Sequence, residues 1–315
     1  MFVSSCSGSV FGLRHATGEI VWTYDTRQDG GQTEFHGTPV VTPELIVAAT
    51  DDRRPGGVAH LYAFERVGGK VSWKLPVGAG AMTDLALVGG DLYLATLGET
   101  VMSVRAATGE ANWVHETGRS NERFFPTSTP VVLGDQVLFG GVDGSLVALA
   151  RGDGKVLWTR QLGDRVATSV VLAGDRLYLG TADGKLHLLN AADGAVVRSA
   201  TLPGVPFGRP LVHDDSVIVL TTGGRAVALA VSLERTVWEA RLDAEWAAFR
   251  PLVVGGLVLG GADDGRVHAL RAGDGSAAWS HDFGGPVTSL TADGATLYVG
   301  TSRGIVYSAV ILAPG

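Results

Sequence analysis

The sequence predicts an all-β fold, an eight-bladed β-propeller made of four-stranded antiparallel blades, and three observations support this prediction. First, a strand of the form G-x-φ-x-A-L recurs about every 40 residues, the length of one propeller blade. Second, each full copy contains four short apolar runs separated by turn residues. Third, helical periodicity is absent throughout. The marker residue of the recurring strand stands at Phe11, Tyr62, Met102, Val147, His187, Val227, His268 and Tyr307.

The clearest copy, residues 128–162, shows why each run is expected to be a strand. It reads "STPVVLGD", "QVLFGGVDG", "SLVALARGDG" and "KVLWTRQL". The runs are rich in Val, Leu and aromatic residues and end at G-D or D-G pairs. Tight hairpins need a positive φ, which glycine adopts without steric cost. Four such strands in antiparallel order form a blade, and repeated blades leave few exposed sheet edges.

The repeats span the whole chain, so we expect a single propeller domain over residues 1–315. The first copy lacks its first strand and the last copy lacks its fourth strand. Seven blades are the alternative, with the N-terminal strand "EIVWTYD" completing the last blade. Residues 1–15 match the repeat well, which favours eight. The copies are expected at about 1–26, 36–78, 79–118, 123–163, 164–204, 205–243, 244–284 and 285–315.

Composition limits the classes of function. The net charge is −7, whereas a nucleic-acid-binding surface needs a basic stripe. Cys6 is the one cysteine, which excludes an intramolecular disulfide and a thiolate zinc site with four cysteines. No apolar run approaches the roughly 18 residues of a membrane span. No signal peptide is visible, so we expect a cytoplasmic protein, or an extracytoplasmic one if the chain is trimmed.

The repeat resembles that of the PQQ-like (pyrroloquinoline-quinone-like) β-propeller family. The resemblance rests on "LYLGTADGKLHLLNAADGAVVR" (177–198), "LVLGGADDGRVHALRAGDGSAAW" (257–279) and "LYLATLGETVMSVRAATGEANW" (92–113). It implies that a tryptophan on each fourth strand packs against the neighbouring blade. Arg198 holds that position in one copy, and we interpret it as a weakened docking site. The implied docking residues are Trp22, Trp73, Trp113, Trp158, Trp238 and Trp279.

The family includes quinoprotein alcohol dehydrogenases, which carry an adjacent cysteine pair over the cofactor and a set of calcium ligands. A chain with one cysteine has no such pair, so we place it in the branch without quinone and expect neither cofactor nor metal. The acidic pairs Asp51–Asp52, Asp214–Asp215 and Asp263–Asp264 are interpreted as solvated hairpin turns.

The first strand of each blade is expected to line the central channel, where propellers usually carry their function. Small hydroxyl residues dominate this column at Thr38, Thr129, Ser169 and Ser289, and Asp84, Arg209 and Arg250 depart from it. Two arginines can hold a carboxylate or phosphate in a fork. The alternative is that the arginines bridge blades. The predicted ligand-binding residues are Arg209, Arg250, Asp84, His36, Phe207, Phe249 and Phe125.

Two insertions interrupt the repeat, at 50–60 and 118–128. Loops on a rigid scaffold often carry recognition. Arg123 and Phe124 in the second insertion are therefore predicted to contact a partner, with neutral variation of a surface loop as the alternative.

These observations favour a monomeric, non-catalytic binding or scaffold propeller that recognises a protein partner or a small anionic ligand at the channel mouth. It would be similar to the PQQ-like propellers of bacterial outer-membrane β-barrel assembly or of some bacterial Ser/Thr kinases. The alternative is a lyase, hydrolase or isomerase that uses Arg209, Arg250, His36 and Asp84 to hold an anion and transfer protons.

Overall fold

The computed structural model describes residues 1–315 except 30–33, 53–56, 82, 120–127, 249 and 312–315. The described residues form eight antiparallel sheets in chain order and one short 3₁₀ helix, Thr26–Asp29. They contain no helix with the length and hydropathy of a membrane span. The chain forms two compact units, Met1–Thr159 and Arg160–Gly315, which are described in turn.

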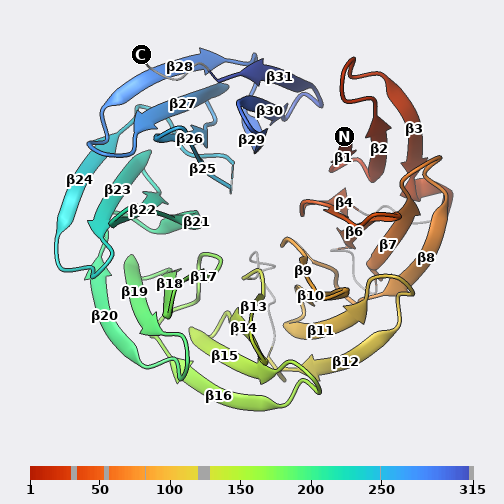
Figure 1. The fold of residues 1–315 in the computed structure, drawn as a ribbon, viewed down its shortest axis with the longest axis horizontal. Helices are drawn as coiled ribbons and strands as arrows, with labels where there is room; N and C mark the ends of the chain where they lie inside the picture. The colour runs from red at the N-terminus through yellow and green to blue at the C-terminus, as the bar shows by residue number, and fades with distance from the viewer. Residues whose placement is uncertain (30–33, 53–56, 82, 120–127, 249, 312–315) are drawn as a thin grey trace. The chain divides into compact units, whose positions relative to one another are not determined.

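The first unit holds four sheets that follow one another along the chain (Figure 1). The first sheet has three strands, and the second has a short additional strand, β4, at the end of β6. The strands are β1 (Phe2–Ser4), β2 (Ser9–Leu13) and β3 (Ile20–Asp25); β4 (Glu34–Phe35), β5 (Val40–Val41), β6 (Leu45–Asp51), β7 (His60–Glu65) and β8 (Val71–Pro76); β9 (Ala86–Val88), β10 (Asp91–Ala95), β11 (Thr100–Arg105) and β12 (Ala111–Glu116); β13 (Val131–Leu133), β14 (Gln136–Gly140), β15 (Ser145–Ala150) and β16 (Val156–Gln161).

The second unit repeats this pattern, and its last sheet has three strands. The strands are β17 (Val171–Ala173), β18 (Arg176–Thr181), β19 (Lys185–Asn190) and β20 (Val196–Thr201); β21 (Pro206–His213), β22 (Ser216–Thr221), β23 (Arg225–Ala230) and β24 (Thr236–Arg241); β25 (Leu252–Val254), β26 (Leu257–Gly261), β27 (Arg266–Arg271) and β28 (Ala277–Asp282); β29 (Val287–Asp293), β30 (Thr296–Thr301) and β31 (Val306–Val310).

Eight sheets with incomplete first and last members confirm the predicted number of blades. β3 pairs with β2, with Thr23 opposite Phe11, so "EIVWTYD" belongs to the first sheet. The seven-blade alternative, in which this strand completes the last blade, is therefore wrong. That the whole chain is one domain stays a prediction.

The two middle strands of each sheet form the core. β10 and β11 are almost entirely buried, whereas the fourth strand β20 is exposed at nearly every residue. Both faces of a middle strand are covered by neighbouring sheets, which explains why these strands read as continuous apolar runs. In the first unit, for example, Val47 and Leu61 of the second sheet share a cluster with Leu92 and Leu94 of the third.

Fourth-strand tryptophans lie where successive sheets meet within a unit. The Nε1–H of Trp73 donates to the carbonyl of Ala106 (3.1 Å), and that of Trp113 donates to the carbonyl of Arg151 (2.8 Å). Each indole lies on a glycine of the same turn, because a Cβ placed on Gly154 would come within 2.6 Å of Trp113. The same bond joins Trp22 to Arg66 and Trp238 to Ala272.

The other two predicted docking tryptophans make other contacts. Trp158 donates to the side-chain oxygen of Gln136 in its own sheet (2.9 Å). Trp279 packs against an apolar cluster that includes Leu297 and Val299 of the last sheet.

Candidate functional site

The short strand β4 creates a cluster of polar side chains at the end of β6. In the ladder Glu34 pairs with Asp51, and Phe35 pairs with Thr50. Successive side chains of a strand point to opposite faces. Phe35 is buried against Tyr62, so Glu34 and the following residue, His36, are directed to the other side, where Asp51 lies.

The imidazole of His36 lies between two carboxylates and a thiol. Its Nδ1 is 2.9 Å from Oδ1 of Asp51, and its Nε2 is 3.4 Å from Oε2 of Glu34. The thiol of Cys6, in the turn between β1 and β2, lies beside the ring and donates to the carbonyl of Phe35 at 3.8 Å. The Asp51 side chain is 1% exposed, that of His36 21% and that of Glu34 54%. The cluster is therefore closed on the Asp51 side and accessible on the Glu34 side.

Hydrogen bonding controls the charge of this site. The bond to Asp51, followed by that to Cys6, raises the pKa of His36 to about 10, although burial acts in the opposite direction. At neutral pH His36 therefore carries a proton and forms an internal ion pair with Asp51.

One interpretation of the acidic pairs from the sequence is wrong. Asp51 and Asp52 are buried, at 2% and 5% exposure, rather than solvated in a hairpin turn. The reason is strand β4, which covers the end of β6, and the following residue, His36, which is a partner for the carboxylate. The pairs Asp214–Asp215 and Asp263–Asp264 are exposed, as expected of turns.

Asp84, another predicted site residue, lies close to the segment that carries His36. Its Oδ1 accepts the backbone N–H of Thr38 (2.8 Å), two residues after His36. The backbones are close here, since a Cβ on Gly37 would collide with the carbonyl of Thr83. The structure thus brings His36 and Asp84 to one region between the second and third sheets, with Asp84 engaged in a backbone contact.

Arg209, Arg250 and Phe207 belong to the second unit. Arg209 is exposed and lies where the ladder of β21 is interrupted, between Phe207 and Leu211. Arg250 is half-buried just before β25, a strand that contacts β21. Phe207 packs on the cluster that contains Ile218 and Leu220. Both arginines have interaction partners, so neither is a free cation. The predicted residues Arg123, Phe124, Phe125 and Phe249 lie outside the described residues.

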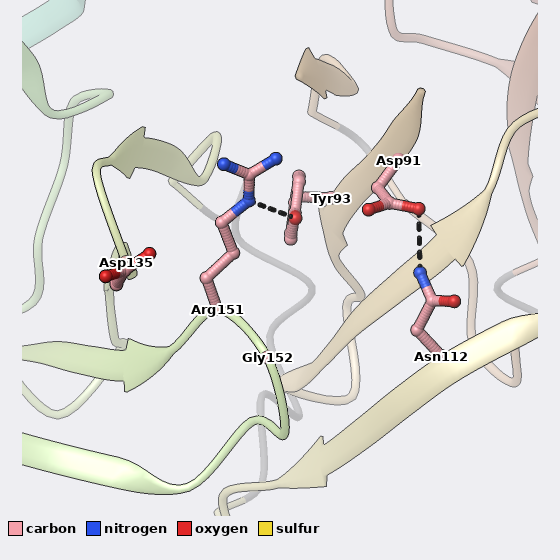
Figure 2. A pocket seen from close by; sticks show the side chains of 6 residues that line it. All are labelled: Asp91, Tyr93, Asn112, Asp135, Arg151 and Gly152. Atoms are coloured by element: carbon pink, nitrogen blue, oxygen red, sulfur yellow. Dashed lines mark hydrogen bonds between the residues drawn. The ribbon is translucent and has the colours of Figure 1, made fainter. Parts of the chain in front are cut away.

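A polar cavity of about 440 Å³ lies between the third and fourth sheets (Figure 2). The Nε–H of Arg151 donates to the hydroxyl of Tyr93 (2.9 Å), and the amide of Asn112 donates to Asp91 (2.9 Å). Arg151 also donates to the carbonyl of Val88 (3.2 Å). These polar groups satisfy one another, which identifies Arg151 as a link between two sheets. The lining residues are Asp91, Tyr93, Asn112, Asp135, Arg151 and Gly152.

Sequence reasoning missed Cys6, Glu34 and Asp51 as neighbours of His36. A signal was available, because Cys6 and Asp51 stand at the same repeat position, occupied by Ala182 in the fifth copy. It also missed Trp246, which is 6% exposed and donates to the carbonyl of Arg225 in the preceding sheet (2.8 Å).

Known structures share this fold. The chain is similar to BamB from Moraxella catarrhalis (24% identity, TM-score 0.79, covering 98% of this chain and 90% of that one). It is also similar to the computationally designed protein Ika8 (16%, TM-score 0.81, 98% and 92%). A third similar structure is the quinohemoprotein alcohol dehydrogenase ADHIIG from Pseudomonas putida HK5 (13%, TM-score 0.70, 95% and 67%). At these identities the likeness shows the fold class alone, that of an eight-bladed β-propeller.

Sequence comparison identifies the family. The outer membrane protein assembly factor BamB of Moranella endobia (strain PCIT) is 24% identical over 166 residues, which cover 51% of this chain. The match spans 40% of that relative's length. The family profile described as outer membrane protein assembly factor BamB matches residues 6–171 and 198–312, nearly the whole chain. The chain therefore belongs to this BamB-like family of PQQ-type repeats.

Proposed function

We propose that the protein is a non-catalytic scaffold that binds a protein partner during the assembly of other proteins. The observation that carries this proposal is the family match over residues 6–171 and 198–312, in a family described as an assembly factor. In such a scaffold the buried middle strands supply rigidity, and the exposed strand entrances and loops supply recognition.

The entrance of β21 is the proposed contact region in the second unit. Gly208, Arg209 and Pro210 interrupt its ladder, and interruptions of this kind redirect side chains at functional sites. The exposed guanidinium of Arg209 is suited to bind a carboxylate of the partner, or a small anion, through paired hydrogen bonds. Phe207 and the half-buried Arg250 on the neighbouring segment would extend this surface.

A lyase, hydrolase or isomerase is less well supported by the geometry. Both ring nitrogens of His36 face carboxylates, and Asp84 accepts a backbone N–H. These groups are therefore engaged in contacts within the protein, whereas a proton-transfer mechanism would need them to be directed at a substrate.

The test is affinity purification from an extract of the source organism with the wild type and two variants. We expect Arg209→Ala/Arg250→Ala to reduce the amount of co-purified partner at least about tenfold, in line with the loss of charged contacts at an interface. Arg14→Ala is the matched control, because Arg14 is an exposed arginine paired with Glu19 in the first sheet. Equal recovery with the double variant would reject the proposed surface. Failure of the wild type to retain any specific partner would reject the scaffold function.

A further inference from the structure

The cluster around His36 has the composition and geometry of a metal site. Glu34, His36 and Asp51 each present a donor atom, and these three atoms lie within 4.8 Å of one another. Protein ligands bind Zn²⁺ at about 2.0–2.3 Å, so donors around one ion are separated by less than about twice that length. Among the described residues this is the one group of at least three such side chains whose donor atoms converge in this way.

The donor set favours a transition metal over calcium or magnesium. Imidazole nitrogen suits zinc, copper and nickel, whereas Ca²⁺ and Mg²⁺ prefer oxygen ligands alone. Histidine nitrogen together with aspartate and glutamate oxygen is a ligand combination that zinc accepts. These donors come from separate parts of the chain, so their convergence is a product of the fold.

We propose that Glu34, His36 and Asp51 bind one divalent transition-metal ion, with Zn²⁺ as the best match. The ion would displace the proton that His36 carries in the metal-free protein. Asp51 is held rigidly because it is buried at the end of β6, which orients its carboxylate in advance. Glu34 is half-exposed and gives the ion access from solvent. The inference does not depend on the proposed scaffold function.

Titration of the metal-free full chain with Co²⁺ tests the site, since tetrahedral Co²⁺ absorbs visible light. We expect saturation at one equivalent and displacement of Co²⁺ by Zn²⁺. His36→Ala is expected to abolish the visible bands. Glu34→Gln is expected to weaken binding at least about tenfold, the lower end of the effect of losing a supporting group.

His268→Ala is the matched control, because the imidazole of His268 also contacts a carboxylate, Asp264, at 2.9 Å but belongs to no such group. Circular dichroism establishes that each variant is folded. Glu34 is half-exposed, so Glu34→Gln tests the site even if His36→Ala fails to fold. Absence of tetrahedral Co²⁺ bands in the folded wild type would overturn the proposal, as would wild-type affinity in Glu34→Gln.

Discussion

Two junctions between sheets can be compared, that of the third with the fourth and that of the fifth with the sixth. They involve the same repeat positions, but the side chains at these positions differ. In the first unit Trp113 donates to the carbonyl of Arg151 and lies on Gly154. In the second unit Arg198 stands at the tryptophan position and Glu234 at the glycine position of the following turn. The two replacements face each other, because the Arg198 guanidinium lies 3.3 Å from the Glu234 carboxylate.

The carbonyl that a tryptophan would satisfy has another donor at the second junction. Val231 stands at the position of Arg151, and its carbonyl accepts the hydroxyl of Tyr178 (2.8 Å). Tyr93 holds the corresponding position in the third sheet, where its hydroxyl accepts the guanidinium of Arg151 instead. A docking position is therefore one part of a matched set: the glycine is required where an indole lies on it, and is dispensable where no indole is present.

The largest effect is expected from Trp113→Ala. Trp113 is 8% exposed and packs with Tyr93, Phe139 and Val147, so its removal leaves a cavity and an unpaired carbonyl. Loss of a buried aromatic side chain costs about 3–5 kcal/mol. The free energy of unfolding from urea titration measures this loss. Arg198→Ala at the equivalent position is the comparison, and an equal loss in both variants would contradict the difference between the junctions.

A smaller effect is expected from Gly154→Ala. Gly154 has a φ of 71°, and an added Cβ would lie 2.6 Å from the Trp113 ring. Gly174→Ala is the control, because Gly174 has a φ of 61° and open space around its Cβ position. Both variants share the cost of a left-handed conformation, and Gly154→Ala adds about 1–3 kcal/mol of overpacking. Equal unfolding free energies would show that the indole does not need the glycine.

Tyr178→Phe is expected to destabilise the second unit by about 1 kcal/mol, since it leaves the Val231 carbonyl without its donor. Thermal unfolding measures the change. Tyr307→Phe is the control. Tyr307 lies in the last sheet, and its ring packs on Phe283. A Tyr178→Phe protein as stable as the control would indicate that solvent satisfies this carbonyl.

The smallest effect is expected for the exposed pair of Arg198 and Glu234. Their side chains are 46% and 63% exposed, and such pairs contribute less than about 1 kcal/mol. Arg198→Trp alone is not expected to stabilise the protein, because Glu234 occupies the place of the glycine that receives an indole. We expect Arg198→Trp/Glu234→Gly to have a free energy of unfolding about 0.5–3 kcal/mol higher than the two single substitutions would give if their effects were additive, as measured in a double-mutant cycle. Additive effects of the two substitutions on the free energy of unfolding would contradict the view that the tryptophan and the glycine form a matched set.

The candidate site was less predictable than the fold. Asp84 was selected because it departs from a column of hydroxyl residues, and His36 because it flanks the entrance of a first strand; both lie in one region of the first unit. The partners of His36 were missed, because Glu34 and His36 meet Asp51 only through the pairing of β4 with β6. Pairings of this kind join residues about 15 or more positions apart, so local periodicity does not predict them.

The blade-like repeat, the eight sheets, the incomplete first and last members and the turns follow from the sequence, because each depends on local alternation of apolar and polar residues and on glycine at positive φ. The side chains that meet between sheets were found in the folded chain alone. Folding buries Asp51 against His36, brings Cys6 from the turn between β1 and β2 to the same ring, and places Arg198 against Glu234. These contacts depend on how neighbouring sheets are positioned, which a repeat of about 40 residues allows in several ways.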